Sequence, residues 1–209
     1  MDFTLRTHLN LEGNKINRLN FSNLENMLEN YDYADYYVQL NLYNNPMNCD
    51  CNIYDLLLCL QRDINQIKIP KIIVSIKLLF CQAPVEYYGV SVRNLNFTTF
   101  TCEKEKSQFS PDHPCGINGR CDCHFRPFDK NLYINCSGRN FFTAPKLLGL
   151  SFEVIKIELN LQENNLKEII DMSLLEYNKI EFLDLSNNQI SHISDRILSG
   201  NLKVLNKII

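Results

Sequence analysis

Cysteine is the residue whose number and spacing most clearly suggest chemistry in this chain. Nine of the 209 residues are cysteines, and eight of them fall between positions 49 and 136 in two groups of four. The first group is Cys49, Cys51, Cys81 and Cys102, and the second is Cys115, Cys121, Cys123 and Cys136. Clustered cysteines of this kind either form disulfides or bind zinc.

The zinc alternative rests on the second group, where Cys121, Cys123 and His124 are close together and Cys115 lies nearby. Structural zinc sites usually contain paired C-x2-C knuckles, and no such pair occurs in this sequence. We therefore expect disulfides in both groups and no bound metal.

Catalytic chemistry has little support in the sequence. The four histidines, His8, His113, His124 and His192, lie in unrelated settings. No nucleophile elbow, HExxH motif or glycine-rich phosphate loop is present. Carboxylates are abundant, but an exposed charged face is the ordinary reason for them. We therefore expect neither an enzyme nor a cofactor site.

Charge and sequons bound the possible partners. The formal net charge is −3, which supplies no long-range attraction to nucleic acid or to anionic lipid. Three N-x-S/T sequons make Asn20, Asn96 and Asn135 candidate glycosylation sites, and they mildly favour an extracellular setting. We therefore expect protein partners and no nucleic acid.

Targeting segments are not evident. The first ten residues, MDFTLRTHLN, lack the apolar core of a signal peptide. The longest apolar run, 64–80, is interrupted by Lys68, Pro70, Lys71 and Lys77 and does not resemble a membrane span. We expect an internal piece of a larger secreted or membrane-anchored protein, or a truncated gene model.

Leucines recur in the spacing L-x-x-L-x-L-x-x-N-x-L, which is the template for a short strand followed by a tight turn. The matching positions are Leu9, Leu11, Asn14 and Ile16; Leu40, Leu42, Asn45 and Met47; Leu159, Leu161, Asn164 and Leu166; and Ile180, Leu183, Leu185, Asn188 and Ile190. Alternating leucines face the core. Each asparagine should turn inward and bond backbone groups of its own turn and of the neighbouring repeat. The sequence therefore predicts leucine-rich repeats on both sides of the cysteine groups.

The upstream repeats are unusually far apart, because Asn14 and Asn45 are 31 residues apart whereas Asn164 and Asn188 are 24 apart. The extra length falls near residues 30–38, NYDYADYYV. This stretch is either a tolerated surface insertion or an acidic, aromatic contact surface, open to tyrosine sulfation, for a basic partner.

Stacked repeats have open ends that must be covered. We interpret the first cysteine group as the cap that closes the upstream repeats and the second as the cap that opens the downstream repeats. A helix beginning at Asp50 or Asn52 should cover the last upstream repeat. Its apolar face comprises Ile53, Leu56, Leu57, Leu60 and Ile64. Cys59 lies off this face and either packs as a small hydrophobe or bonds another chain.

The predicted fold class is α/β, a leucine-rich-repeat solenoid in two short arrays joined by disulfide-rich caps. The end of the upstream array occupies 1–48, the carboxy-terminal cap 49–102, an exposed connector 103–114, the amino-terminal cap 115–148 and the start of the downstream array 149–209. Within 115–148 we expect a small hairpin. A third downstream repeat begins at Leu202 and Leu205 and places Lys207 at an inward position.

Both caps resemble those of a known family. The stretches NPMNCDCNIYDLLLCL and FCQAPVEYYGVSV, with the closing Cys102, resemble the carboxy-terminal cap of extracellular leucine-rich-repeat proteins. CGINGRCDCHFRPFDKNLYINCSG resembles the amino-terminal cap inside insect Toll receptors. The resemblance covers nearly the whole chain and implies the pairs Cys49–Cys81 and Cys51–Cys102, while the pairing in the second group stays open. Met47 replaces the Trp often found before the first cap.

Membership of the Toll and Toll-like receptor family would imply a single-pass receptor. Its outer domain would bind a processed cystine-knot cytokine of the Spätzle type and dimerise for innate immune or developmental signalling. The expected location is the extracellular side of the plasma membrane, with membrane contact only through segments outside this chain. The alternatives are a secreted Slit-like guidance ligand, which would show further capped blocks and EGF modules downstream, and a leucine-rich-repeat adhesion protein.

Overall fold

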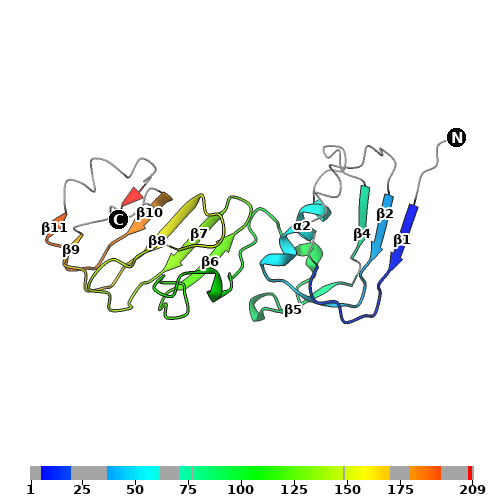
Figure 1. The fold of residues 1–209 in the computed structure, drawn as a ribbon, viewed down its shortest axis with the longest axis horizontal. Helices are drawn as coiled ribbons and strands as arrows, with labels where there is room; N and C mark the ends of the chain where they lie inside the picture. Colours follow the sequence, from blue (N-terminus) through cyan, green and yellow to red (C-terminus); the bar gives the residue numbers. More distant parts are fainter. Residues whose placement is uncertain are drawn as a thin grey trace. The chain divides into compact units, whose positions relative to one another are not determined.

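The structure is a computed structural model that describes residues 6–19, 37–61, 71–76, 78–147, 149–169, 179–193 and 207–208. The chain divides into two compact units, Met1–Phe100 (unit 1) and Thr101–Ile209 (unit 2) (Figure 1). The acidic, tyrosine-rich stretch 30–38 lies outside the described residues except for the backbone of its last two positions, which begin a strand.

Unit 1 is built on a parallel sheet with the strand order β1-β2-β4 (Figure 1). The strands are β1 (Arg6–Asn10), β2 (Tyr37–Asn41) and β4 (Lys71–Ser75). A second parallel pair joins β3 (Pro46–Asn48) to β5 (Phe80–Ala83). Short 3-10 helices η1 (Cys51–Ile53), η3 (Val85–Tyr87) and η4 (Val92–Asn94) complete the described part of the unit, together with helix α2 (Tyr54–Gln61).

The predicted helix is confirmed, and Asp50 is its capping residue. The Asp50 side chain accepts a hydrogen bond from the Asn52 backbone N–H at 2.9 Å, which starts η1, and α2 follows directly. Ile53, Leu56 and Leu57 are buried on the predicted apolar face. The helix packs against β4 and η4. Of the remaining predicted positions, Ile64 and the side chain of Cys59 lie outside what the structure describes.

Strand β4 corrects the predicted course of residues 49–102. The cap prediction placed no strand at 71–75, yet KIIVS pairs in register with β2 and extends the sheet of the upstream repeats. The run does not match the leucine template, so the repeat pattern does not predict it. Its consecutive β-branched residues favour a strand all the same.

Unit 2 is built on a five-stranded sheet with the order β12-β10-β8-β7-β6. The strands are β6 (Asp122–Arg126), β7 (Asn131–Asn135), β8 (Lys156–Asn160), β10 (Ile180–Asp184) and β12 (Lys207–Ile208). The β6–β7 pair is antiparallel and confirms the predicted hairpin, whereas the other pairs are parallel. A second parallel pair joins β9 (Glu168–Ile169) to β11 (His192–Ile193).

Alternate residues of these strands form the core of unit 2. Leu132, Ile134, Ile157, Leu159 and Leu183 are all buried, while the residues between them are partly or fully exposed on β7, β8 and β10, apart from Asn131. The register also corrects the prediction for the last strand. Lys207 is aligned with Phe182, and Ile208 with buried Leu183. Ile208 therefore occupies the core-aligned position that the sequence interpretation gave to Lys207.

Residues 103–114 differ from the exposed connector that their charge and prolines predict. They include η5 (Lys106–Gln108), and they bury Phe109 and His113 within unit 2. The centroid of the Phe109 ring lies 4.9 Å from that of His113 and 5.3 Å from that of Phe152. The Phe152 ring also packs against Phe125, with 5.3 Å between the two centroids. Aromatic packing holds this segment in place despite its polar composition.

Disulfides form in both cysteine groups. Cys49 is bonded to Cys81, with Cα atoms 5.5 Å apart, in unit 1. In unit 2, Cys115 is bonded to Cys123 and Cys121 to Cys136, with Cα separations of 5.8 and 4.6 Å. Cys51 and Cys102 each take part in a disulfide as well. Within the described parts of the chain, no group of three or more His, Cys, Asp or Glu side chains could hold a metal ion.

Candidate binding face

The repeat asparagines form a hydrogen-bonded ladder inside the turns. Asn45, which is only 4% exposed, donates from Nδ2 to the carbonyl oxygens of Leu11, Leu42 and Tyr43 at 2.8–3.2 Å. Its Oδ1 accepts from the Ile16 backbone N–H at 3.0 Å. Because Leu11 and Ile16 belong to the preceding repeat, one side chain bonds its own turn to its neighbour.

Asn164 does the same at the first turn after the second cysteine group. Its Nδ2 donates to the carbonyl oxygens of Cys136, Leu161 and Gln162 at 2.9–3.1 Å. Its Oδ1 accepts from the backbone N–H groups of Arg139 and Phe141 at 3.1 and 2.9 Å. Asn164 therefore bonds the first downstream repeat to the cystine-rich segment before it.

The two remaining asparagines differ in whether they bond a neighbouring repeat. Asn188 bonds Leu161 of the preceding repeat at 2.8 Å and accepts from the Leu166 N–H at 3.1 Å. Asn14 is exposed, and its partners among the described residues are the carbonyl groups of Leu11 and Glu12 in its own turn. All four asparagines thus serve the backbone, which makes them structural residues.

A second set of Asn and Asp side chains ends the strands. The Oδ1 atom of each accepts the backbone N–H two residues later at 2.9–3.2 Å, and the set comprises Asn10, Asn41, Asn135, Asn160 and Asp184. In unit 2, Asn135, Asn160 and Asp184 are cross-strand neighbours in the register. The sequence interpretation missed this row, although an Asn or Asp is the fifth and last residue of each of these strands.

The outward side chains of the unit 2 sheet form a continuous face of three cross-strand rows. The register aligns Arg126, Asn131 and Lys156 in one row, His124, Tyr133, Glu158 and Phe182 in the next, and Asp122, Asn135, Asn160 and Asp184 in the third. These rows could not be predicted, because they depend on which strands are neighbours.

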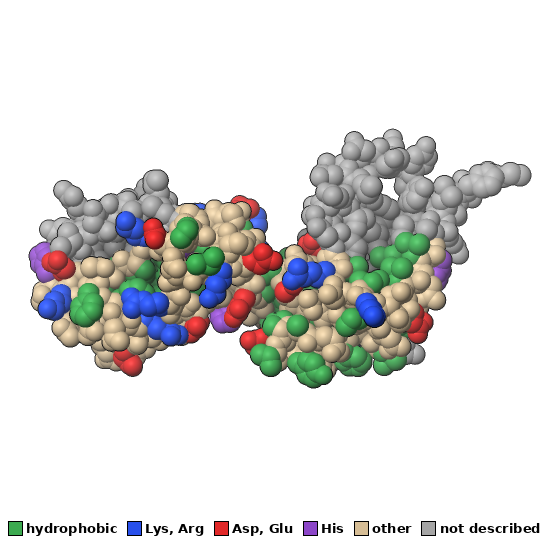
Figure 2. All heavy atoms as spheres, turned by 60° about the horizontal axis from the view of Figure 1, so that its bottom comes forward, with side chains coloured by type: hydrophobic (Ala, Val, Ile, Leu, Met, Phe, Trp, Pro, Cys, Tyr) green, Lys and Arg blue, Asp and Glu red, His purple; other side chains and the backbone are tan. Residues whose placement is uncertain are grey.

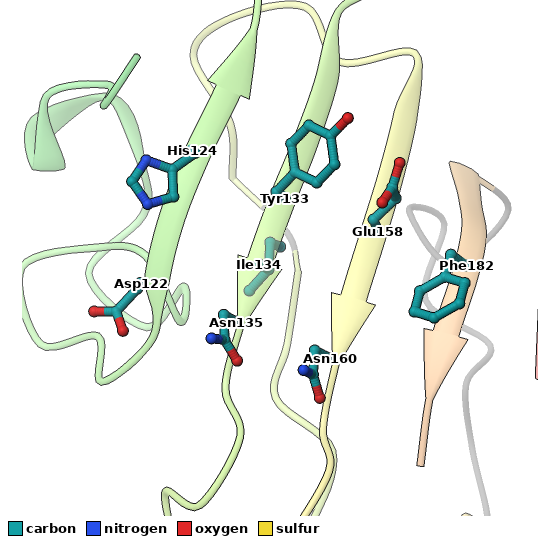
Figure 3. A pocket seen from close by; sticks show the side chains of 8 residues that line it. All are labelled: Asp122, His124, Tyr133, Ile134, Asn135, Glu158, Asn160 and Phe182. Carbon is teal, nitrogen blue, oxygen red and sulfur yellow. The ribbon is translucent and has the colours of Figure 1, made fainter. Parts of the chain in front are cut away.

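A hollow lies over the second and third of these rows (Figure 3). Its volume is about 220 Å³, and its lining is Asp122, His124, Tyr133, Ile134, Asn135, Glu158, Asn160 and Phe182. In Figure 3 Tyr133, Glu158 and Phe182 lie side by side on three strands, while Asn135 and Asn160 lie toward the strand ends. The hollow offers two aromatic rings, carboxylates and amides to a ligand.

Ion pairs fix the charged side chains around this face. Arg126 binds Asp129 through two contacts of 2.6 and 2.8 Å, and its guanidinium lies 5.2 Å from the Tyr133 ring. That hydrogen bond lowers the pKa of Asp129. Burial, followed by the negative charge of Glu158, raises the pKa of Tyr133. Glu158 itself accepts from the Asn131 amide at 2.7 Å. These contacts link the charged side chains of the face to one another.

The aromatic, carboxylate and amide groups of this face are suited to binding a ligand. His124 is exposed on β6, and the nearby acidic groups are engaged: Asp122 with Arg139 at 2.8 Å, and Glu158 with Asn131. His113 is buried elsewhere in unit 2, among Phe109 and its neighbours, and burial lowers its pKa to about 4. No nucleophile and base are brought together among the described residues of this face.

Unit 1 exposes apolar side chains of its own. Leu78, Phe80, Val85 and Tyr88 are exposed around β5 and η3, and Figure 2 shows hydrophobic side chains on the surface of this unit. Leu78 also has a positive φ of 65°, a backbone conformation that Leu rarely adopts. The sequence did not predict this exposed patch, because the same apolar residues would equally suit the buried interior of a cap.

The structure places two of the three sequons on the surface. Asn96 and Asn135 are both exposed, and in each the side-chain oxygen accepts from the hydroxyl of the sequon's third residue at 2.8 Å. Asn135 is also a lining residue of the hollow, whereas Asn96 lies in unit 1. Asn20 lies outside the described residues.

Parallel strands whose turns are joined by buried asparagines, next to cystine-bonded segments, define a leucine-rich-repeat protein. No family model matches the chain. It is 30% identical over 201 residues to Protein toll of Drosophila melanogaster, a match that covers 94% of this chain and 18% of the relative.

The structure resembles the solved Toll–Spätzle complex of Drosophila. The TM-score is 0.66 at 24% identity, over 96% of this chain and 27% of that chain. A glycosylated form of the same complex gives 0.61 at 24% identity, over 90% of this chain and 26% of the other.

The chain resembles the Toll receptor family along nearly its whole length. The likeness to the chain of the solved complex shows a shared fold. The chain spans about a fifth of the length of its curated relative. None of its described helices is long and apolar enough to cross a bilayer.

Proposed function

We propose that this chain is a segment of the outer domain of a Toll-type transmembrane receptor. The parent protein binds a protein ligand, a cystine-knot cytokine of the Spätzle type, and dimerises for innate immune or developmental signalling on the extracellular side of the plasma membrane. The observation that carries this proposal is the 30% identity to Toll over 94% of the chain. The Toll structures that the chain resembles contain Spätzle.

The part that this segment plays is to set receptor geometry. Residues 1–48 end an upstream array that the cap 49–102 closes, and residues 115–148 form the cap that opens the downstream array at 149–209. Cystines and the asparagine ladder support this assignment, because they bond neighbouring turns and cysteine-rich segments within each unit. Ligand binding would then act through a change in subunit arrangement, without any chemical step.

A chimeric receptor tests the proposal. The matching segment of Drosophila Toll would be replaced by this chain, and surface expression and Spätzle-dependent signalling would be measured in cultured cells. We expect the chimera to reach the surface and to respond to ligand. Deleting the segment provides the control. A chimera that is displayed normally but stays silent with ligand would refute the assignment.

A further inference from the structure

We propose that Asn135 is N-glycosylated and that the first sugars of its glycan occupy the hollow on the strand face of unit 2. Asn135 is itself part of the lining, beside Tyr133, Glu158 and Asn160 (Figure 3). The occupant is therefore tethered at the edge of its own site. The inference rests on the proposed function in one respect, because an N-glycan requires passage through the secretory route.

The turn around Asn135 uses only the oxygen of its amide. Oδ1 accepts from the backbone N–H of Ser137 at 3.1 Å and from its hydroxyl at 2.8 Å. No hydrogen bond engages Nδ2 among the described residues, and the side chain is exposed. The atom that would carry the sugar is therefore available.

Glycosylation at this atom preserves every bond that the fold needs. The next strands show this, because Asp184 stands in the same cross-strand row and accepts from Ser186 N–H at 2.9 Å and Ser186 Oγ at 2.6 Å. Asp184 has no amide nitrogen. The fold thus depends on the side-chain oxygen at this position, and the nitrogen is free for another role.

The transfer reaction requires a lipid pyrophosphate-linked oligosaccharide as donor. Nδ2 of Asn135 forms a bond to the anomeric carbon of the sugar, and the bond from that carbon to the pyrophosphate oxygen breaks. The leaving pyrophosphate keeps the electron pair, and one proton leaves Nδ2. Oδ1 remains a carbonyl oxygen, so its bonds to Ser137 persist.

The hollow fits a sugar better than a polypeptide. Its volume of about 220 Å³ is below the roughly 300–1,000 Å³ of pockets for larger ligands. The rings of Tyr133 and Phe182 offer apolar surface to the C–H groups of a sugar. Glu158 and Asn160 offer acceptors for its hydroxyl groups. A tether keeps the local sugar concentration high, so modest contacts suffice.

Asn96 supplies a matched control within the same chain. Its Oδ1 accepts from Thr98 N–H at 2.9 Å and from Thr98 Oγ1 at 2.8 Å, and it is exposed, but it does not line the hollow. The full chain would be secreted from insect cells behind a cleavable signal. Glycopeptide mass spectrometry would give the occupancy of both sites, and an amidase that releases N-glycans would then be applied to the native protein.

We expect both sites to be occupied and the Asn135 glycan to be released about tenfold more slowly than the Asn96 glycan, equivalent to about 1.4 kcal/mol of protection. Phe182→Ala should narrow this difference, and unfolding should abolish it. Asn135→Asp keeps a side-chain oxygen that can accept from Ser137, as Asp184 accepts from Ser186. The variant should therefore fold normally and lose only the glycan at position 135.

The outcomes separate the two proposals. A secreted chain with Asn96 occupied and Asn135 bare overturns this inference and leaves the receptor assignment standing. Equal release rates at the two sites in the native protein overturn the seating of the sugar in the hollow. Two bare sites on a chain that never leaves the cell overturn both proposals.

Discussion

Replacing Asn164 by Ala should remove much of the stability of unit 2. The side chain is 5% exposed and makes five hydrogen bonds, of which those to the carbonyl oxygens of Cys136 and Leu161 are buried. An unpaired buried acceptor costs about 1–3 kcal/mol, so these two carbonyls alone cost about 2–6 kcal/mol. The three partly buried bonds can be replaced by water. We expect a loss of about 4 kcal/mol, against a total of about 5–15 kcal/mol for a typical domain.

Hydrogen–deuterium exchange of peptides from β7 and β8 measures this loss in unit 2 alone. The neighbouring Asn165 is a matched control, because its contacts to Asn140 and Gln189 are exposed and as long as 3.4–3.5 Å. Asn165→Ala should cost less than about 0.5 kcal/mol. If the two variants speed exchange equally, the ladder does not stabilise the unit and this reasoning is wrong.

Three further perturbations probe unit 2. Burial lowers the pKa of His113 to about 4, so the folded state favours the neutral imidazole. Stability is then complete above the unfolded pKa of about 6.5 and falls by up to about 3 kcal/mol as pH drops toward 4. His113→Asn, which keeps an acceptor for the Cys115 N–H, should flatten that dependence in pH-resolved unfolding curves; an unchanged slope would exclude His113 as the cause. Gly119→Ala would place a Cβ against the Pro114 carbonyl oxygen and should cost about 1–3 kcal/mol in denaturant titrations, whereas an unshifted midpoint would show that the turn yields. Glu163 has a φ of 56°, so Glu163→Gly should raise the melting temperature by relieving about 1 kcal/mol of strain, and a lowered value would contradict that account.

The sequence predicted those features that local spacing determines. The repeat asparagines, the capped helix after Cys49 and the β6–β7 hairpin each depend on residues within one turn or a few positions. The αL turns show the same locality. Gly13, Asn44, Glu163 and Asn187 each precede a repeat asparagine and each has a positive φ. Only Glu163 among them is a residue that gives no sequence hint of that conformation.

What the sequence did not predict depends on contacts between distant segments. Residues 71–75 are apolar in a way that fits a strand or a buried helix, and only pairing with β2 decides between them. Phe109 sits in a charged stretch, and its burial follows from contact with Phe152, which is distant in the sequence; His113 is buried against Phe109 in turn. The hollow has the same origin, because its lining comes from strands separated by up to about sixty residues of chain.

The asparagine ladder also extends from the repeat turns into the cystine-rich segment. Asn188 reaches back to the Leu161 carbonyl and accepts from the Leu166 N–H, and Asn164 makes the equivalent bonds to Cys136 and Phe141. Cys136 therefore stands where a repeat has its leucine, and its disulfide to Cys121 replaces leucine packing at a fully buried position.

The same alignment shows where the ladder stops. The residue of β7's own turn that corresponds to Asn164 is Arg139, three positions after Cys136. Arg139 cannot accept backbone N–H groups, and it pairs instead with Asp122 on β6 at 2.8 Å. Strand β6 runs antiparallel and presents no preceding turn to bond. At β7, therefore, an arginine takes the position of the ladder asparagine, next to the strand pair at which the sheet becomes antiparallel.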